Sequence, residues 1–215
     1  MELDVCIPTF NSEKTLPFCL KAVKKVLPYK RIIICDGFSS DNTIKIARKF
    51  GCEIYFSQER LGGARNKLIS LVETEWFAFI DSDVVINKKW YKLLTSSIDE
   101  KTGAVNGFAL PKNIFLNFVR RSIILLKSYL GIPQRGFTSN TLVRKSAVEG
   151  IKIPNLSRCE DIFLQRKIEE KGWKWKFVKA FCIHLKPSRT IIKDAIKDLS
   201  LMRKSEKFSR SILRL

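Results

Sequence analysis

The tripeptide Asp81-Ser82-Asp83 follows directly after the apolar run of residues 76–80. Two carboxylates one residue apart, at the end of a buried strand, supply oxygen ligands of the kind that Mg²⁺ and Mn²⁺ prefer. A divalent cation at this point would hold a diphosphate group and neutralise the charge that develops as the diphosphate leaves. Asp-x-Asp is also a common polar turn, so the pattern gains weight only if other residues converge on it.

The elements around this tripeptide are expected to bring such residues to it. The first hundred residues alternate between strand and helix signals, which predicts βαβ units and a parallel sheet covered on both faces. Ligands of such sheets bind beyond the carboxyl ends of the strands. Thr9 and Asn11 follow the first strand, Asp36 follows the second, and Asp81 and Asp83 follow the fourth. Strands are expected at residues 3–7, 31–35, 53–56 and 76–80, and helices at residues 12–26, 40–50 and 62–72, with Ser12 and either Ser40 or Asp41 as caps.

The second half of the chain is less regular. It shows no internal repeat, low-complexity tract or linker, so one α/β domain with a C-terminal extension is the simplest organisation. Strands are expected at residues 104–110, 138–143, 173–178 and 181–184, and helices at residues 114–130, 161–170 and 190–215.

Charge is distributed unevenly along the 215 residues. The chain carries 40 Lys+Arg and 21 Asp+Glu, for a net charge of +19. Residues 1–100 hold 15 basic and 13 acidic side chains, whereas residues 101–215 hold 25 and 8. A field of that sign recruits nucleic acid, acidic lipid headgroups or a phosphorylated substrate, and a solvated lysine-rich surface is the other interpretation.

The six cysteines form no C-x-x-C pair, and Cys6, Cys35 and Cys182 lie in apolar runs. This pattern favours free thiols in a reducing cytosol over a zinc site. The N-terminus shows no secretory signal, and no run of 18 apolar residues occurs. We therefore expect a cytoplasmic protein without a membrane-spanning helix.

Five local patterns occur in a fixed order. They are Ile7-Pro8-Thr9-Phe10-Asn11, Asp36-Gly37-Phe38-Ser39-Ser40-Asp41-Asn42-Thr43, Gly63-Ala64-Arg65-Asn66, Asp81-Ser82-Asp83, and Glu160-Asp161 followed by Leu164 and Arg166. Together, over roughly residues 3–185, they resemble a family 2 glycosyltransferase of the GT-A fold. The resemblance implies a mostly parallel central sheet flanked by helices, within a domain over residues 1–189. Its nucleotide-binding half would cover residues 1–103, its acceptor half 104–189, and a basic amphipathic helix would follow over 190–215.

The resemblance also implies which residues form the site. Asp83 and His184 would hold Mg²⁺ or Mn²⁺, and Asp161 would be the general base of an inverting transfer. Gly62 and Gly63 would let the backbone pass close to a ligand. The residues expected to bind the nucleotide and donor sugar are Pro8, Thr9, Asn11, Asp36, Gly63, Arg65, Asp81, Ser82, Asn140 and Glu160.

The same residue types have plain structural interpretations. Asp36 or the Glu160-Asp161 pair could cap helices, and Arg65 could form a surface ion pair. A single histidine after a strand, as His184 is, is more often a structural residue than a metal ligand.

Two departures from the family pattern narrow the prediction. The usual double aspartate of the second pattern is Cys35-Asp36 here, so one carboxylate is missing. No Q-x-x-R-W follows the Glu-Asp pair, where the chain reads Gln165-Arg166-Lys167. We therefore expect a non-processive enzyme, resembling the dolichyl-phosphate sugar synthases, that adds one sugar per acceptor.

The apolar and basic helices expected at residues 114–130 and 190–215 bear on the acceptor. Both could lie in a membrane interface, and packing on the protein's own core is the alternative. The basic second half favours peripheral contact with the acidic cytoplasmic face of a membrane. A UDP- or GDP-sugar donor and a polyprenyl phosphate or polyprenyl-linked glycan acceptor fit these features. Because a phosphate acceptor arrives ionised, it would leave Asp161 a positioning role.

Two other functions stay open. A sugar-nucleotide nucleotidyltransferase shares the fold, but residues 8–14 lack the glycine-rich phosphate loop of those enzymes. A non-enzymatic nucleic-acid-binding protein would account for the charge. It would leave the ordered acidic motifs unexplained, so no specific nucleic-acid partner is expected.

Overall fold

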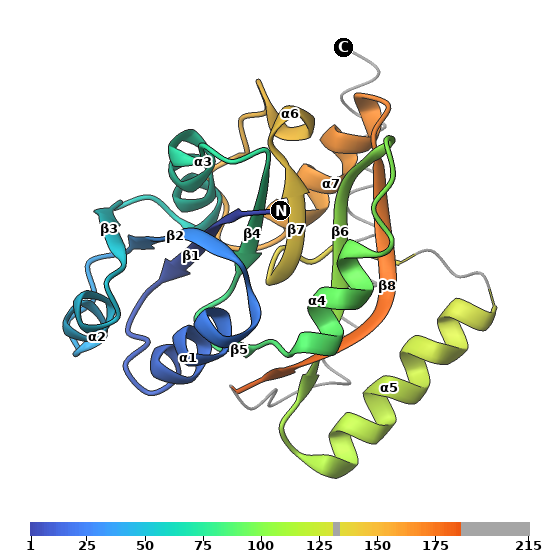
Figure 1. Ribbon diagram of the computed structural model, residues 1–215, viewed down its shortest axis with the longest axis horizontal. Helices are drawn as coiled ribbons and strands as arrows, with labels where there is room; N and C mark the ends of the chain where they lie inside the picture. Colours follow the sequence, from blue (N-terminus) through green and yellow to red (C-terminus); the bar gives the residue numbers. More distant parts are fainter. Residues whose placement is uncertain (131–133, 186–215) are drawn as a thin grey trace.

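The computed structural model describes residues 1–130 and 134–185 (Figure 1). Within these ranges, eight strands form one sheet in the order β3-β2-β1-β4-β7-β6-β8-β5. The strands are β1 (Leu3–Thr9), β2 (Tyr29–Asp36), β3 (Glu53–Phe56), β4 (Trp76–Ile80), β5 (Val84–Val85), β6 (Thr102–Pro111), β7 (Asn140–Arg144) and β8 (Lys174–His184). The helices are α1 (Leu16–Val26), α2 (Thr43–Lys49), α3 (Leu61–Leu71), α4 (Lys88–Thr95), α5 (Ile114–Tyr129), α6 (Lys145–Val148) and α7 (Glu160–Glu170). The helix expected over residues 190–215, and the end of the domain at 189, lie outside the described residues.

The first half of the chain has the predicted βαβ arrangement. Strand β1 pairs in parallel with β2 and with β4, and β2 pairs in parallel with β3. In this register Thr9 lies opposite Asp36, at the ends of β1 and β2. The carboxyl ends of these parallel strands lie on the same side of the sheet, and Asp81 follows the carboxyl end of β4 there.

The second half makes the sheet mixed rather than mostly parallel. Strand β7 runs antiparallel to both β4 and β6, β8 is parallel to β6, and β5 is antiparallel to β8. In the first half, helices connect strands that run parallel. In the second half, helices also lie between strands that run antiparallel, as α5 does between β6 and β7. The antiparallel pairings place Asn140 opposite Ile80 and His184 opposite Val84, so both reach the edge where Asp81 lies.

Two elements differ from the prediction for local reasons. The two short strands expected at residues 173–184 are one strand, β8, because residues 178–180 form a bulge opposite Gly107. A Cβ at Gly107 would lie 2.4 Å from the Ala180 carbonyl oxygen, so only glycine fits beside the bulge. Helix α1 begins at Leu16 with Thr15 as its N-cap, because the Ser12 hydroxyl instead contacts the Ser82 hydroxyl at 2.9 Å. Strand β5 and helices α4 and α6 were not predicted.

The sheet is covered on both faces. Leu3, Val5 and Ile7 of β1 pack with α1, α2 and α4, whereas Cys6 points to the other face, which α3, α6 and α7 cover. This alternation follows from the two-residue period of a strand. All six cysteines are free thiols, and Cys35 and Cys182 are buried as predicted.

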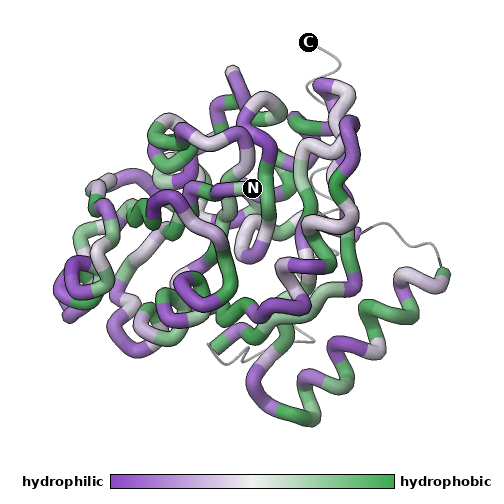
Figure 2. The backbone as a smooth tube through the Cα atoms, in the orientation of Figure 1, coloured by the Kyte–Doolittle hydropathy of each residue, from purple (hydrophilic) through white to green (hydrophobic). Residues whose placement is uncertain are grey.

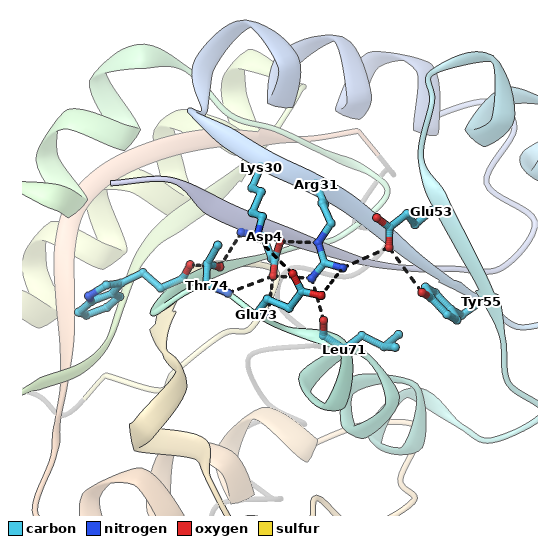
Figure 3. Close-up of polar contacts among 9 residues, drawn as sticks. Asp4, Lys30, Arg31, Glu53, Tyr55, Leu71, Glu73 and Thr74 are labelled. Carbon is cyan, nitrogen blue, oxygen red and sulfur yellow. Dashed lines mark hydrogen bonds and ion pairs between the residues drawn. The ribbon is translucent and has the colours of Figure 1, made fainter.

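An ion-pair network around the buried Asp4 connects the amino-terminal ends of β1 and β2 (Figure 3). Asp4 is fully buried and accepts from Arg31 through two bonds, Nε to Oδ1 at 3.0 Å and Nη2 to Oδ2 at 2.9 Å. The backbone N–H groups of Glu73 and Thr74 donate to the same carboxylate, at 2.6 and 3.3 Å. Arg31 also pairs with Glu53 at 3.4 Å. The network joins β1, β2, β3 and the end of α3 at the edge opposite the polar strand ends.

Helix α5 is the most exposed element of the described chain. It lies along the rim of the molecule beside β6 and β8, and its surface is largely apolar (Figures 1 and 2). Only Ile124 is buried, against Phe108 and Leu110, whereas Phe115 and Phe118 are 72% and 70% exposed. No helix within the described residues is both long enough and apolar enough to cross a membrane.

Candidate active site

Two hollows meet at the carboxyl edge of the sheet. The first, the β1 cleft, has a volume of about 560 Å³ and lies between the ends of β1 and β2, residues 57–61 and residues 81–83. The second, the α7 cavity, has a volume of about 270 Å³ and lies between residues 137–140, the start of α7 and α5. Leu61 and Asp81 line both hollows. A ligand in one hollow would therefore touch a ligand in the other near Asp81.

The wall of the β1 cleft is held by a hydrogen-bond network around Asp36. The Thr9 hydroxyl donates to Asp36 Oδ2 at 2.6 Å, and the Ser39 N–H and hydroxyl donate to Oδ1 and Oδ2, each at 2.7 Å. Asp36 is fully buried. Because a carboxylate offers about four acceptor positions, three internal donors leave it little capacity for a ligand. Asp36 thus fixes the loop after β2.

Asn11 and Asp41 hold the neighbouring turns. Asn11 has a positive φ of 45°, and its side-chain oxygen accepts from the Ser40 N–H at 2.9 Å. The N-cap of α2 is Asn42 and not Ser40 or Asp41, but Asp41 accepts from the Thr43 N–H at 2.9 Å at the start of this helix and from the Glu13 N–H at 3.0 Å. Neither Asn11 nor Asp41 lines the β1 cleft, whose wall includes Pro8, Thr9 and Ser82.

The glycine pair at the start of α3 accommodates the protein's own chain. A Cβ at Gly62 would lie 2.0 Å from the Pro154 carbonyl oxygen, and a Cβ at Gly63 would lie 2.1 Å from a carboxylate oxygen of Glu59. The Gly62 N–H also donates to the Leu156 carbonyl at 2.9 Å. Neither glycine lines the β1 cleft or the α7 cavity, and the close approach that each glycine allows in this structure is to the protein's own chain.

Arg65 connects two of the acidic motifs. Its side chain is 1% exposed, which rules out a surface ion pair. Nη2 contacts Asp81 Oδ1 at 3.0 Å, and Nε contacts Glu160 Oε1 at 3.3 Å, over the ring of Phe79. Nη1 is buried and has no hydrogen-bond partner within the described residues. The guanidinium therefore holds both carboxylates at the α7 cavity and keeps one donor nitrogen unused.

The carboxylates of Glu160 and Asp161 open α7 but do not cap it. The N-cap is Cys159, at a φ of 66°, and it makes no side-chain cap. Burial raises the pKa of the Glu160 carboxyl above its ordinary value, although the charge of Arg65 acts in the opposite direction. Both carboxylates line the α7 cavity.

Arg135 holds Asp161. Its Nη2 lies 2.9 Å from Oδ1 and 3.1 Å from Oδ2 of Asp161. The Ile162 N–H donates to Oδ1 at 2.9 Å, so Oδ1 has two donors and Oδ2 has one within the described chain. The remaining acceptor position of Asp161 is therefore on Oδ2. Sequence reasoning missed Arg135, because it pairs with a residue 26 positions away and no local pattern marks it.

Asn140 lies in the back wall of the α7 cavity. It is 1% exposed, its oxygen accepts from Trp90 Nε1 at 3.1 Å, and its nitrogen donates to the Ser139 hydroxyl at 3.2 Å. The predicted donor-binding residue is therefore fixed in place by α4. Trp90 was also missed, because the helix that carries it was not predicted.

Asp83 and His184 are adjacent although 101 positions separate them. His184 Nε2 lies 3.5 Å from Asp83 Oδ1, and the Leu185 N–H donates to the Asp83 carbonyl at 2.8 Å. Two ligands that share one cation at roughly 2.1 Å lie about 3 Å apart, so this pair fits a shared Mg²⁺ or Mn²⁺. Within the described residues no three His, Cys, Asp or Glu side chains form a ready metal cluster, so a bound diphosphate would have to supply further oxygens.

The family model "Glycosyl transferase family 2" matches residues 4–157. That range holds most of the chain and includes the patterns that follow β1, β2 and β4, but not Glu160-Asp161. The chain belongs to this family. The family prediction is thus confirmed.

Two curated relatives illustrate how much of a family 2 protein the chain matches. The poly(ribitol-phosphate) β-N-acetylglucosaminyltransferase TarS of Staphylococcus aureus is 30% identical over 133 residues, which cover 54% of this chain and 23% of TarS. The cholesterol galactosyltransferase of Borreliella burgdorferi is 25% identical over 189 residues, which cover 80% of this chain and 51% of that protein. The chain spans less than two thirds of the length of either relative.

Solved structures confirm the fold of this family 2 chain. Glucosyl-3-phosphoglycerate synthase from Mycobacterium tuberculosis, in complex with Mn²⁺ and UDP-glucose, aligns with a TM-score of 0.69 at 16% identity over 97% of this chain and 78% of that one. S. aureus TarS 1–349, in complex with UDP-GlcNAc, aligns with a TM-score of 0.67 at 21% identity over 87% and 59%. The domain has the predicted GT-A fold, with the mixed sheet described above.

Proposed function

We propose that this protein transfers one sugar at a time, with inversion, from a UDP- or GDP-sugar to an anionic, lipid-linked acceptor. The observation that carries the proposal is the meeting of the β1 cleft and the α7 cavity at Asp81, with Asp83 lining the first and Asp161 lining the second. A donor in the cleft and an acceptor in the cavity would be held in contact there, which lowers the entropic part of the barrier.

The donor nucleotide occupies the β1 cleft, beside Pro8 and Thr9, and its diphosphate lies at Asp81 and Asp83. Asp83 and His184 would hold a Mg²⁺ or Mn²⁺ ion. When bound, this ion would neutralise the negative charge that develops on the leaving diphosphate. The solved structures similar to this chain include complexes with UDP-glucose and UDP-GlcNAc, which favours UDP over GDP as the nucleotide.

Asp161 is the general base. Its Oδ2, the oxygen with the unused acceptor position, takes the proton of the acceptor hydroxyl while the acceptor oxygen attacks the anomeric carbon. The bond from that carbon to the diphosphate breaks on the opposite face, so the configuration inverts. Arg135 keeps the carboxylate pointed into the cavity through its contacts to both oxygens. Glu160 and Arg65 hold the wall between donor and acceptor.

The second half of the chain supports an anionic acceptor. Arg120 of α5 lines the α7 cavity, and no Asp or Glu occurs between Lys101 and Val148. TarS is named for poly(ribitol-phosphate), a phosphate-rich polymer, and the Borreliella relative is named for cholesterol, a membrane lipid. An acceptor with a phosphate next to an apolar chain combines both properties.

Helix α5 supports a lipid-linked acceptor at a membrane surface. Its outward face carries exposed Ile114, Phe115 and Phe118, whereas its inward face carries Ile124 and Arg120. An amphipathic helix of a globular protein normally turns its apolar stripe to the core. Helix α5 buries Ile124 but leaves much of its apolar surface outside, which suits a helix that lies on the acyl boundary of a bilayer and reaches the acceptor headgroup with Arg120.

The test is donor binding by the Asp83→Ala variant, measured by calorimetry with UDP-sugars and GDP-sugars in the presence and absence of Mn²⁺. We expect Mn²⁺ to strengthen binding to the wild type, and the variant to lose at least about 10-fold in affinity only when Mn²⁺ is present. Asp99→Ala is the matched control, because Asp99 pairs with Lys176 away from both hollows. Equal affinity of the two variants would remove Asp83 from the metal site.

A further inference from the structure

A third hollow, the α1 groove, lies next to the active site, because its lining residue Leu185 follows His184 and donates to the Asp83 carbonyl. It has a volume of about 830 Å³ and is bounded by α1, β5 with the residues that follow it, and the end of β8. It shares no lining residue with the β1 cleft or the α7 cavity. Its volume lies within the range of roughly 300–1,000 Å³ that is typical of ligand sites.

The floor of the α1 groove is apolar. It is lined by Ala22, Val26, Val85, Ile86, Ile183 and Leu185. Phe18, one turn before Ala22 on α1, stands at the side of the groove with 57% of its surface exposed. An apolar floor of this kind suits a hydrocarbon chain better than a polar metabolite.

The rim of the α1 groove is basic. Lys21 and Lys25 of α1 stand on one side and Lys88 and Lys112 on the others, and no acidic residue lines the groove. Lys112 lies just before α5, whose exposed Ile114 and Phe115 follow it. Helices α1 and α5 lie at the same end of the molecule (Figure 1), and Lys112 connects the rim of the groove to the start of α5.

We propose that the α1 groove binds one acyl chain of an anionic membrane phospholipid, with the phosphate on its rim lysines. The charge of each candidate occupant distinguishes an anionic lipid from the chain that follows Leu185 and from a second copy of the protein. The chain that follows Leu185 carries nine Lys and Arg against three Asp and Glu, and a second copy of the protein carries +19. Either would be repelled by four lysines, whereas an anionic headgroup neutralises them.

The lipid in this groove is distinct from the acceptor in the α7 cavity. Its role is to hold the protein on the bilayer next to α5, so that two contacts rather than one fix the orientation of the active site toward the membrane. A single apolar contact gives only marginal membrane binding, and a second one converts it into stable binding.

The experiment uses the full chain and monomeric dihexanoyl-phosphatidylglycerol, with dihexanoyl-phosphatidylcholine as the uncharged comparison. Binding is followed by NMR of methyl groups in the groove, such as those of Val26, Val85 and Ile183. We expect phosphatidylglycerol to shift these signals at concentrations where phosphatidylcholine does not. A Lys21→Glu/Lys25→Glu variant should bind phosphatidylglycerol at least about 10-fold more weakly, because each basic residue near an anionic lipid contributes several-fold to affinity.

The matched control is Lys24→Glu, on the same helix. Lys24 lies over the Phe50 ring, 5.9 Å from its centroid, on the side of α1 that faces α2. This variant should bind the lipid like the wild type, and all variants should keep wild-type affinity for a UDP-sugar, which separates this proposal from the proposed activity. The proposal is overturned if both lipids bind equally, if Lys24→Glu weakens binding as much as the double variant does, or if only signals of α5 shift. A dimer that loses affinity in the double variant would instead make the groove a self-association surface and overturn it as well.

Discussion

Two arginines, the partly exposed Arg31 and the buried Arg65, pair with carboxylates at opposite ends of the same sheet, and the two networks differ in how completely their hydrogen-bonding groups are satisfied. At the amino-terminal end, Asp4 receives four donor groups, two from Arg31 and two from the backbone (Figure 3). Neither residue lines the β1 cleft or the α7 cavity. This network is closed, and what it does is hold β1, β2 and the end of α3 together.

At the carboxyl-terminal end, Arg65 pairs with Asp81 and Glu160, but its Nη1 lacks a partner within the described chain. Nearby, Asp161 keeps one acceptor position on Oδ2. These groups line hollows instead of packed core. Buried polar groups left unsatisfied are uncommon and call for an explanation, and a bound substrate supplies one. Hydrogen-bonding groups without a protein partner thus indicate that the substrate binds at the carboxyl-terminal end of the sheet.

Replacing an aspartate by asparagine should lower activity at the carboxyl-terminal end of the sheet and stability at the amino-terminal end. The largest effect is expected on turnover, at Asp161. Asp161→Asn keeps the side-chain shape and an oxygen that accepts from Arg135, but it loses basicity. Turnover on a hydroxyl acceptor should fall by roughly 100-fold or more, with donor affinity and the free energy of unfolding unchanged. Steady-state kinetics and calorimetry measure this. Full activity would show that the acceptor arrives ionised, as a polyprenyl phosphate does.

The next largest effect is expected at the closed network. Asp4→Asn leaves the Arg31 guanidinium beside a neutral amide, so the free energy of unfolding should fall by about 2–4 kcal/mol. Turnover per folded molecule should stay at the wild-type level. Denaturant unfolding followed by circular dichroism gives the first quantity and kinetics give the second. A loss of activity that exceeds the loss of folded protein would contradict the assignment of this network to structure alone.

A smaller effect is expected at Arg135, which positions Asp161 without touching the reacting atoms. Arg135→Gln should lower turnover by roughly 10-fold, since a misoriented base retains part of its effect. Arg135→Lys should recover part of that loss, and the KM for the donor should not change. The same pair of substitutions at Arg144, which pairs with Glu75 at the far end of β7, serves as control. If Lys and Gln are equally impaired, the charge of Arg135 is not what holds Asp161.

The smallest and most specific effect is the pH dependence of stability, which should have opposite signs at the two ends. Burial opposes ionisation of Asp4, but the hydrogen bonds from Arg31 and from two backbone N–H groups outweigh it, so its pKa lies below 3.8. A lowered pKa adds stability above the unfolded value, and this is lost as the pH falls through the folded one. Burial raises the pKa of Glu160 above 4.5, so its contribution is present below that value and is lost as the pH rises.

Unfolding curves of the wild type, Asp4→Asn and Glu160→Gln between pH 3 and pH 8 would measure this contrast. The advantage of the wild type over Asp4→Asn should shrink toward acid. Relative to Glu160→Gln, the wild type should lose stability from acid toward neutral pH. If the stability difference from the wild type changed with pH in the same direction for both variants, the pKa values of Asp4 and Glu160 would not be shifted in opposite directions.

The parts of the site that local sequence determines were predictable, and the parts that long-range pairing determines were not. Asp36, Asp81 and Asp83 were expected at the strand ends because parallel strands place their carboxyl ends together, and they are there. The pairing of Arg135 with Asp161 has no local signal, because it depends on how the loop after α5 crosses α7.

The signals at Gly62 and at residues 173–184 were incomplete for a similar reason, because each depends on a distant part of the chain. A glycine pair indicates a close approach but does not say to what, and at Gly62 the neighbour is the chain at Pro154. Residues 173–178 and 181–184 were expected to be two strands, whereas a bulge opposite Gly107 keeps β8 continuous. The direction of β7 was likewise unpredictable, since an antiparallel neighbour of β4 leaves no mark in the sequence of either strand.

The position of β7 in the sheet has a consequence for how the chain can be divided. All five residues of β4 are buried, and the strand that covers its second edge comes from residues 140–144, some sixty positions later. A fragment cut near residue 103 would keep every aspartate motif of the first half but would expose β4 as an unpaired edge, apolar on both faces. Such an edge is a template for aggregation. The two halves therefore form one folding unit, and we expect neither half to fold when it is expressed without the other.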